Sequence, residues 1–302
     1  MQIMMTRLFV LLLVCSLLFA GCNGGGPGPV NSANTGAAPQ RIVSLSPNVT
    51  EILYGIGAWP QVIAVSEYCT YPEDVKNKPR VNGWDRTNLE QVVALKPDFV
   101  IGVEAQEPFV REKLDGLGVK SLFLKGQKLA DVFRSIVEIG RATGHEAAAN
   151  ELSAKTQGEI EQVRQTVAGL SRPRVLCVID RLPGTIRDIY TATRGSFIDE
   201  LIQIAGGDPV APPGQEGYGK ITKEAVLSLN PQVIIDMVQG SKGKFGEDPI
   251  SVWDELSEVD AVRHKRIYPM TDEWVIHPSQ FVGQTAKTFA RVLHPEKFAD
   301  AK

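Results

Sequence analysis

The feature that most constrains the fold of this chain is an internal duplication. Residues 89–102 and 223–236 align without a gap, so that Glu90 falls on Glu224. Each copy reads as a short helix, a proline that ends the helix, and a strand of apolar residues. Two copies of one unit predict two similar lobes rather than a solenoid.

The duplication continues upstream of these blocks. An aromatic residue that follows a glycine stands six positions before each glutamate, Trp84 in the first copy and Tyr218 in the second. Two further pairs of segments match in the same order: residues 50–57 with 199–207, and the apolar runs 41–45 with 174–179. Because apolar runs alternate with helical segments, we expect an α/β protein in which each lobe has a central sheet flanked by helices.

Residues 143–171 separate the copies and favour one long helix. They contain no proline and are rich in Ala, Glu and Gln, which favour helix. A partial apolar stripe follows helical periodicity: Leu152, Ile160, Val163 and Val167. A helix of this length would span about 40 Å and could join lobes at 40–142 and 172–302 as a rigid strut. The alternative is an ordinary crossover helix within one sheet. With the strut, we expect a ligand cleft between the lobes and little closure on binding.

The N-terminus predicts export and a lipid anchor. Arg7 precedes an apolar run at residues 8–20 that is too short to span a bilayer comfortably. Small residues then lead directly into Cys22, so that residues 1–22 resemble a bacterial lipoprotein signal, whose cysteine is acylated. The alternative is an ordinary signal peptide with an incidental cysteine. Residues 23–39, dominated by Gly, Pro, Asn, Ser and Ala, read as a flexible tether on the extracytoplasmic face.

Charge and cysteine usage exclude several classes of function. The net charge is −3 and the isoelectric point about 5.9, so nothing indicates a nucleic-acid partner. No phosphate-binding glycine loop, zinc-protease helix or nucleophile elbow occurs. Cys69 and Cys177 fall in different predicted lobes. We expect buried free thiols, although an oxidising compartment would permit a disulfide.

Several motifs together resemble one known family. They are residues 41–51, Glu67-Tyr68, Tyr71-Pro72, Gly83-Trp84, residues 88–90 and residues 95–98. The chain is similar to the periplasmic binding proteins of cobalamin, siderophore and heme importers, most strongly across 41–102 and less so across 216–236. The resemblance implies a monomer without a catalytic cofactor. It would deliver its solute to the two-fold permease and ATPase subunits of an ABC importer.

Within this family the chain looks most like the cobalamin-binding members, which implies a set of ligand-contacting aromatic residues. The matching positions are Tyr68, Trp84, Tyr190 and Tyr218, of which Tyr190 depends on the loosest alignment. Trp274, after the expected strand 266–270, is a further candidate for the wall of the ligand site. Aromatic rings that face a broad apolar corrinoid would bury both of its faces. The alternative is that these rings are ordinary core or half-buried surface residues.

The resemblance gives the two repeated acids a different role. In the family, one exposed glutamate in each lobe docks arginines of the permease, which here implies Glu90 and Glu224. Such charge-assisted hydrogen bonds are strong and directional. The alternative is that each acid is simply favoured by the dipole at a helix start.

Other residues keep two further functions open. His277 could ligate a heme iron or supply an axial ligand to cobalt, whereas the remaining histidines read as surface or helix-end residues: His145, His264 and His294. Arg181 could grip an anionic siderophore or remain a solvated loop residue. A solute-binding protein of the same kind of importer that carries a ferric siderophore or heme is therefore an alternative to a corrinoid-binding protein. An anchored enzyme that uses Asp180, Glu273 and His277 is an alternative of another class.

Overall fold

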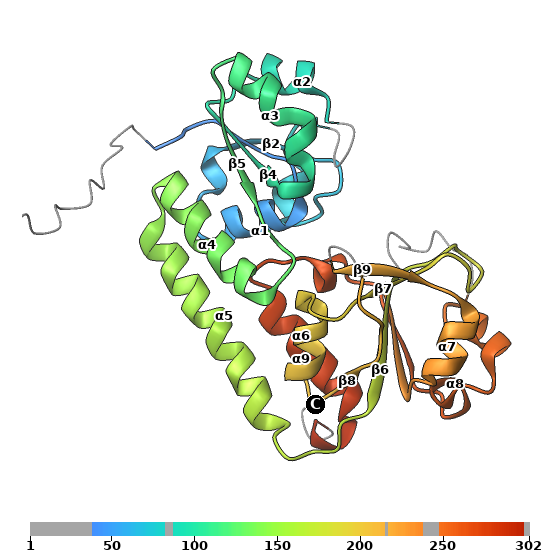
Figure 1. Ribbon diagram of the computed structural model, residues 1–302. Helices are drawn as coiled ribbons and strands as arrows, with labels where there is room; N and C mark the ends of the chain where they lie inside the picture. Colours follow the sequence, from blue (N-terminus) through green and yellow to red (C-terminus); the bar gives the residue numbers. More distant parts are fainter. Residues whose placement is uncertain (1–37, 82–86, 215–216, 238–247, 299–302) are drawn as a thin grey trace, which may run out of the picture. The chain divides into compact units, whose positions relative to one another are not determined.

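The computed structural model describes residues 38–81, 87–214, 217–237 and 248–298, and residues 38–302 form one compact unit (Figure 1). The predicted signal segment, Cys22 and Trp84 lie outside the described residues. The described part is of the α/β class expected from the sequence, with two sheets flanked by helices. None of its helices is both long and apolar enough to cross a membrane.

The first sheet has five strands in the order β3-β2-β1-β4-β5, and all of its neighbouring strands are parallel. Its strands are β1 (Ile42–Ser44), β2 (Val62–Ser66), β3 (Arg80–Val81), β4 (Phe99–Val103) and β5 (Lys120–Leu124). The helices around it are α1 (Pro47–Gly55), α2 (Leu89–Ala94) and α3 (Glu107–Gly116), with short 3-10 turns η1 (Trp59–Gln61), η2 (Glu73–Asn77) and η3 (Glu104–Gln106).

The second sheet has the order β11-β10-β6-β7-β9, with β8 also paired to β6. Its strands are β6 (Arg174–Asp180), β7 (Ile189–Ala192), β8 (Asp208–Pro209), β9 (Tyr218–Ile221), β10 (Val233–Met237) and β11 (Ile267–Met270). Its helices are α6 (Phe197–Ile204), α7 (Lys223–Leu229), α8 (Asp260–Arg263) and α9 (Val282–Leu293), with 3-10 turns η4 (Ser251–Leu256), η5 (Glu273–Ile276) and η6 (Pro295–Lys297). The pairs β6–β7 and β7–β9 are antiparallel, and the other pairs of this sheet are parallel.

The two sheets share one parallel unit, as the duplication predicts. The order β2-β1-β4-β5 corresponds to β8-β6-β10-β11. The register is also the same, because Ile42 pairs with Phe99 in the first sheet and the aligned Val175 pairs with Val233 in the second. The structure therefore extends the repeat beyond the segments that match in sequence, to β5 and β11.

The loop before β4 and the loop before β10 are built in the same way. Lys96 and Asn230 both adopt left-handed backbone, with φ of 49° and 39°. Each carbonyl accepts a hydrogen bond from the arginine that opens the first strand. Arg41 Nε lies 2.9 Å from Lys96 O, and Arg174 Nη2 lies 2.7 Å from Asn230 O. The duplication is thus retained in the hydrogen bonds as well as in the strand order.

The core follows the alternation of the strands. In β6, Cys177 faces one apolar cluster, whereas its neighbours Leu176 and Val178 face another. The largest cluster, which contains Cys177, also contains Ile42 and Ile101 of the first sheet, so a single apolar core runs through both lobes. The other face of each sheet is covered separately, by α2 and α3 in the first lobe and by α7, α8 and η4 in the second (Figure 1).

Two helices, rather than one, occupy the region between the repeats. The expected helix at 143–171 is α5 (Glu146–Thr166), about 31 Å long at 1.5 Å per residue. Thr143 instead ends α4 (Leu129–Thr143), and Gly144 follows with φ of 79°, a backbone conformation that stops a helix. The two helices pack closely, since a Cβ atom at Gly140 of α4 would collide with Ala149 of α5.

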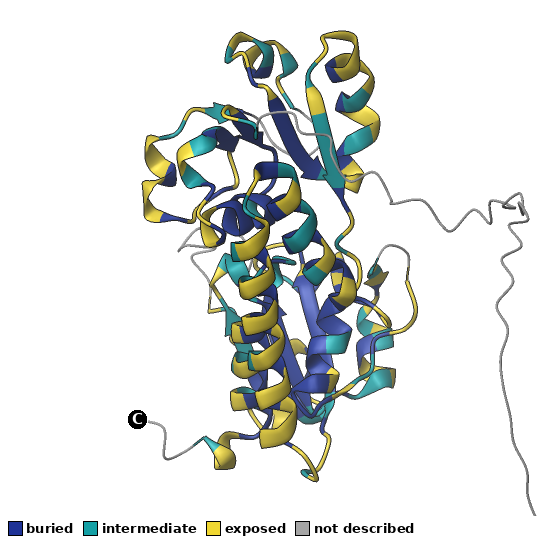
Figure 2. Cartoon of the chain, turned by 90° about the vertical axis from the view of Figure 1, so that its left-hand side faces the viewer, coloured by how far each residue is buried: buried dark blue, intermediate teal, exposed yellow. Residues whose placement is uncertain are grey.

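The buried stripe of α5 also differs from the expected one. Leu152 is only half-buried, and the first buried positions carry small or polar residues: Ala149, Ser153 and Thr156. Ile160 and Val163 are buried as expected. Figure 2 shows exposed residues along the outer side of this helix. Val167 is buried as well, so the stripe departs from the prediction only near Leu152, where α4 approaches and small residues are needed.

The start of α1 is formed by Ser46 and Pro47. Pro47 occupies the first turn, as its fixed φ favours. Ser46 stands immediately before the helix, but its side chain does not cap it, because Ser46 Oγ donates to Asn48 Oδ1 at 2.5 Å. Capping is found instead at α2, α6 and α7, by Asn88, Ser196 and Thr222.

Candidate functional site

Two of the predicted ligand-contacting tyrosines lie together on the second sheet. In the antiparallel pair β7 and β9, Tyr190 pairs with Lys220, and Ala192 pairs with Tyr218. Paired residues and alternate residues share a face of a sheet, so Tyr190 and Tyr218 are diagonal neighbours on one face. Ala192 on this face belongs to the apolar cluster that runs through both lobes. The two rings therefore lie on the face of the second sheet that carries this common core, and the first lobe lies on the same side.

Both rings remain partly open to solvent. Tyr190 is 43% exposed and Tyr218 is 41% exposed. Desolvation nevertheless raises the pKa of Tyr218, and the nearby Cys177 raises it further. The Tyr218 ring is thus partly exposed and yet largely surrounded by protein atoms. The Tyr190 ring instead has Lys220 Nζ at 5.8 Å from its centroid. Half-exposed aromatic rings on a firm backbone are well suited to receive an apolar ligand.

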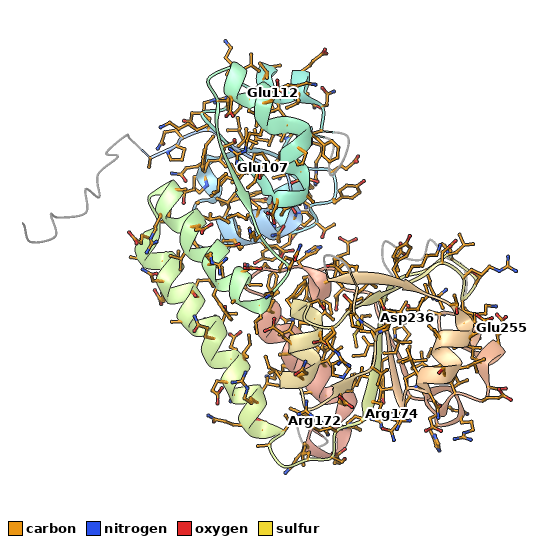
Figure 3. The ribbon with its side chains drawn as sticks, in the orientation of Figure 1. Glu107, Glu112, Arg172, Arg174, Asp236 and Glu255 are labelled. Atoms are coloured by element: carbon orange, nitrogen blue, oxygen red, sulfur yellow. The ribbon has the colours of Figure 1, made fainter. Side chains whose placement is uncertain are left out.

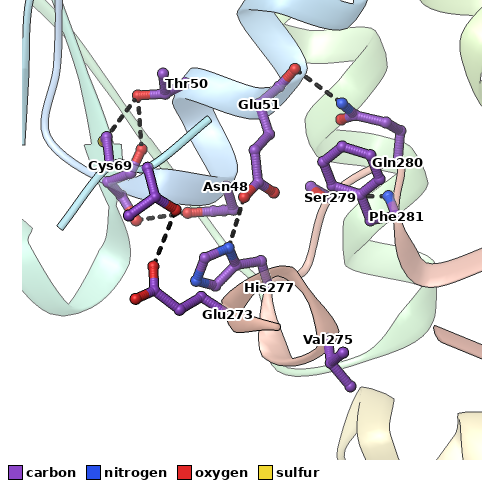
Figure 4. A network of polar contacts seen from close by, with 12 residues as sticks. Asn48, Thr50, Glu51, Cys69, Glu273, Val275, His277, Ser279, Gln280 and Phe281 are labelled. Carbon is purple, nitrogen blue, oxygen red and sulfur yellow. Dashed lines mark hydrogen bonds and ion pairs between the residues drawn. The ribbon is translucent and has the colours of Figure 1, made fainter. Parts of the chain in front are cut away.

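Tyr68 and Trp274 lie in two loops that are bonded to each other. Tyr68 follows β2 and is 54% exposed, and Trp274 lies in η5 after β11. Thr70 Oγ1 of the first loop donates to Glu273 Oε2 of the second at 2.9 Å (Figure 4). Each loop leaves the carboxyl end of a parallel strand, where open α/β sheets place their ligand-binding groups.

An aromatic chain crosses between the same two loops. Tyr54 contacts Tyr71, Tyr71 contacts Phe281, and Phe281 contacts Trp274, with ring centroids 5.2, 5.2 and 5.9 Å apart. The first two contacts are edge-to-face and the third is tilted at 50°, and aromatic contacts of this kind stabilise beyond the area they bury. Trp274 is half-buried and packs against Phe281. Part of its indole surface therefore belongs to the junction between the lobes.

His277 has a carboxylate partner from the other lobe. Its Nδ1 lies 2.6 Å from Oε1 of Glu51, which is 2% exposed in α1 (Figure 4). Because a carboxylate can only accept, this bond places the proton on Nδ1 and leaves Nε2 of a neutral imidazole as an acceptor. Gln280 Nε2 also donates to the backbone carbonyl of Glu51 at 2.9 Å. His277 thus joins the lobes, and sequence reasoning did not find this role.

A second glutamate makes the reciprocal contact. Glu200 of α6, which aligns with Glu51 in the repeat, accepts a hydrogen bond from Leu129 N at the start of α4 at 3.2 Å. Glu51 holds the segment that leads into α9, and Glu200 holds the segment that leads into α4. The alignment of residues 50–57 with 199–207 was the signal that could have indicated a shared role for these two acids.

Arg181 is neither a solvated loop residue nor a group that could grip an anion at the surface. It is 7% exposed, and its Nε donates to Asp236 Oδ2 at 3.0 Å. Figure 3 shows Asp236 within the second lobe. Asp180 accepts from the backbone N of Arg181 at 2.9 Å. The three residues of the enzyme alternative therefore bond to three different partners: Asp180 to Arg181, Glu273 to Thr70, and His277 to Glu51.

The remaining predicted features concern cysteines and metals. Cys69 and Cys177 are free and buried, as expected. Burial raises the pKa of Cys69 to about 11 and raises that of Cys177 further, so both remain thiols near neutral pH. Among the described residues, no three His, Cys, Asp or Glu side chains are grouped so that they could hold a metal ion.

The repeated acids Glu90 and Glu224 occupy the same place in two equivalent helices. Each is the second residue of its helix and is exposed, and each follows by two residues the side chain that caps the helix, Asn88 or Thr222. The hydroxyl of Thr222 donates to the Glu224 carboxylate and lowers its pKa. The two carboxylates are thus presented to solvent in matching local geometry.

Two related lobes, joined by paired helices and lined by aromatic residues at strand ends, define a bilobal binding protein. The sequence profile described as periplasmic binding protein matches residues 42–273. The chain therefore belongs to the periplasmic binding protein family, whose members bind solutes.

Individual relatives agree with this assignment. The chain is 29% identical over 267 residues to an uncharacterised ABC transporter substrate-binding lipoprotein, YvrC, of Bacillus subtilis, covering 87% of this chain and 82% of that one. It is 28% identical over 210 residues to the vitamin B12-binding protein of Pectobacterium carotovorum, covering 69% and 74%. The fold is similar to that of a periplasmic heme-binding protein from Pseudomonas aeruginosa, with a TM-score of 0.76, 22% identity and coverage of 85% and 93%.

Proposed function

We propose that this chain is the lipid-anchored solute-binding protein of an ABC importer and that it captures a corrinoid between its two lobes. The observation that carries the proposal is the placement of Tyr190 and Tyr218 as diagonal neighbours on one sheet face. Tyr68 and Trp274, in the loops joined by Thr70 and Glu273, supply aromatic area at strand ends. Trp84 completes the set that the sequence predicts.

A flat, largely apolar ligand with amide groups at its rim suits these residues. Aromatic rings bury its faces, and the tyrosine hydroxyls offer hydrogen bonds to its edge. The vitamin B12-binding relative supports this choice of ligand. An anionic siderophore would require exposed cationic groups in the cleft, and Arg181, the arginine singled out for that role, is buried against Asp236.

Heme is a second candidate ligand, favoured by His277. Its Nδ1 is held by Glu51, and histidines that bind metals commonly hold their second nitrogen in this way. A heme iron would then be bound through Nε2. The heme-binding protein of P. aeruginosa has a similar fold, so this fold is compatible with heme as well as with a corrinoid.

The position in the cell follows from the N-terminus. We propose that Cys22 carries the lipid anchor, that residues 23–39 form the tether, and that the lobes work at the extracytoplasmic face. The B. subtilis relative is itself named a lipoprotein. Glu90 and Glu224 would dock the two permease subunits, whose ATPase partners drive import.

Titration with cyanocobalamin, hemin and a ferric hydroxamate siderophore tests the ligand. We expect cyanocobalamin to bind tightly in calorimetry. Tyr218→Ala should weaken this binding by roughly 10- to 100-fold, because about 1.5–3 kcal/mol of aromatic burial is lost. Trp84→Ala should have an effect of the same size. Phe109→Ala is the control, since Phe109 of α3 is also an exposed ring, at 54% against 41% for Tyr218.

The outcomes separate the candidates. Tight binding of hemin with loss in His277→Ala, and no binding of cyanocobalamin, would replace the corrinoid by heme. Turnover of a substrate without any tight ligand would instead favour the anchored enzyme. Equal effects of Tyr218→Ala and Phe109→Ala would remove the aromatic site from the proposal.

Ligand binding should change the separation of the lobes very little. The lobes are held by α5, by one continuous core, and by the reciprocal contacts of Glu51 and Glu200. We expect small-angle scattering to give the same radius of gyration with and without saturating ligand. The double variant Glu51→Ala/Glu200→Ala should broaden the distribution of distances. A large ligand-induced compaction of the wild-type protein would contradict a rigid junction.

A further inference from the structure

An apolar depression lies between α2 and α3, on the face of the first sheet that is turned away from the common core. Leu89 and Val93 of α2 line one side, and Leu117, just after α3, lines the other. Leu117 is 55% exposed, and it shares this depression with Leu89 and Val93 instead of standing alone on the surface. The floor is the small apolar cluster beneath these helices, with Val92 and Leu114 at full burial.

The rim of this depression carries one acid and one base, Glu90 and Lys113. The Glu90 carboxylate is exposed, and no ion pair or hydrogen bond joins it to another side chain of the described residues. A partner that offers a basic side chain next to an aliphatic one would meet Glu90 and the apolar wall together.

The second lobe repeats this arrangement in a reduced form. Leu227 stands three residues after Glu224, at the position that aligns with Val93, and it is 37% exposed. At the position of Leu89, however, the second lobe has Lys223, which forms an ion pair with Glu255. Acid and aliphatic side chains are therefore adjacent in both lobes, and in the second lobe the charged Lys223 replaces one apolar wall of the depression.

We infer that the permease subunits bind each glutamate through a basic side chain and place an aliphatic side chain beside it, which in the first lobe enters the depression between α2 and α3. The inference rests on the proposed docking role of Glu90 and Glu224. Apolar burial is not screened by salt, whereas an exposed ion pair is. Docking should therefore have a salt-resistant part, supplied mainly by Leu89, Val93 and Leu117.

The test measures binding of the purified protein to its permease–ATPase complex in nanodiscs, at low and high salt. We expect Leu117→Ser to weaken docking about tenfold and to abolish the part that remains at high salt. Phe109→Ser, which changes an equally exposed residue of α3 outside the depression, should dock like the wild type. Titration with cyanocobalamin should be the same in both variants, which verifies that they are folded.

Glu90→Ala separates the inference from the function on which it rests. If Glu90→Ala weakens docking and Leu117→Ser does not, the depression has no role and the inference is overturned, while the docking role of the acid stands. If neither variant changes docking, the proposed permease face itself is wrong. Self-association or binding to phosphatidylglycerol vesicles that is lost in Leu117→Ser would assign the depression to a second copy or to the membrane, and would also overturn the inference.

Discussion

Asp236→Ala should lower the free energy of unfolding by about 3–5 kcal/mol, the usual cost of removing one partner of a buried ion pair. Asp236 is 1% exposed in β10, and its Oδ2 accepts from Arg181 Nε at 3.0 Å and from Trp253 Nε1 at 2.9 Å. Arg181 is itself buried, so the substitution leaves a positive charge in the protein interior without this carboxylate. Urea unfolding monitored by circular dichroism measures the difference.

Matched variants isolate the cause. Trp253→Phe removes only one donor and should cost about 1 kcal/mol plus any loss of packing. Asp180→Ala, at the exposed end of β6, removes a carboxylate that accepts from the backbone of Arg181 and should cost about 0.5–1.5 kcal/mol. Asp236→Leu combined with Arg181→Met should recover much of the lost stability, because apolar residues of similar size often replace buried ion pairs. A loss below about 1 kcal/mol in Asp236→Ala would show that Arg181 does not depend on this partner.

The duplication allowed the two-lobed fold to be predicted from the sequence. Its signals are local: a helix start, a proline and a strand recur around Glu90 and around Glu224. Because the two copies align, the pairing of β1 with β4 in the first sheet has its counterpart in the pairing of β6 with β10 in the second. The family model and the relatives confirm the class of protein that these segments indicated.

The contacts that join the halves could not be predicted in this way. Glu51 and His277 are 226 residues apart, and an acid within a helix reads as a solvated residue until its neighbours are known. Asp236 aligns with Gly102, so the repeat predicts its strand but not its ion pair. The antiparallel strands β7 and β9 have no counterpart in the first sheet, so their pairing also depends on tertiary structure.

The double variant Glu90→Ala/Glu224→Ala should have the largest effect on import. Each charge-assisted hydrogen bond to an arginine contributes about 1.5–3 kcal/mol, so losing both should weaken docking by roughly 10²- to 10⁴-fold. Each single variant should lose roughly 10- to 100-fold, because the remaining lobe still binds. Glu151→Ala/Glu161→Ala removes two exposed acids from α5 and controls for the change in net charge.

The pH dependence of docking through Glu224 tests the proposal independently of the alanine variants. The Thr222 hydroxyl lowers the pKa of Glu224, so this carboxylate remains ionised, and able to bind an arginine, to lower pH than an ordinary glutamate. Thr222→Val removes that donor, and the loss of docking on acidification should then begin at higher pH. Nanodisc binding followed from pH 7 downward measures the shift. Docking that is unchanged in the double variant and in the control alike would mean that the permease meets another face of the protein, and the matching geometry of the two acids would then reflect only the capping of equivalent helices.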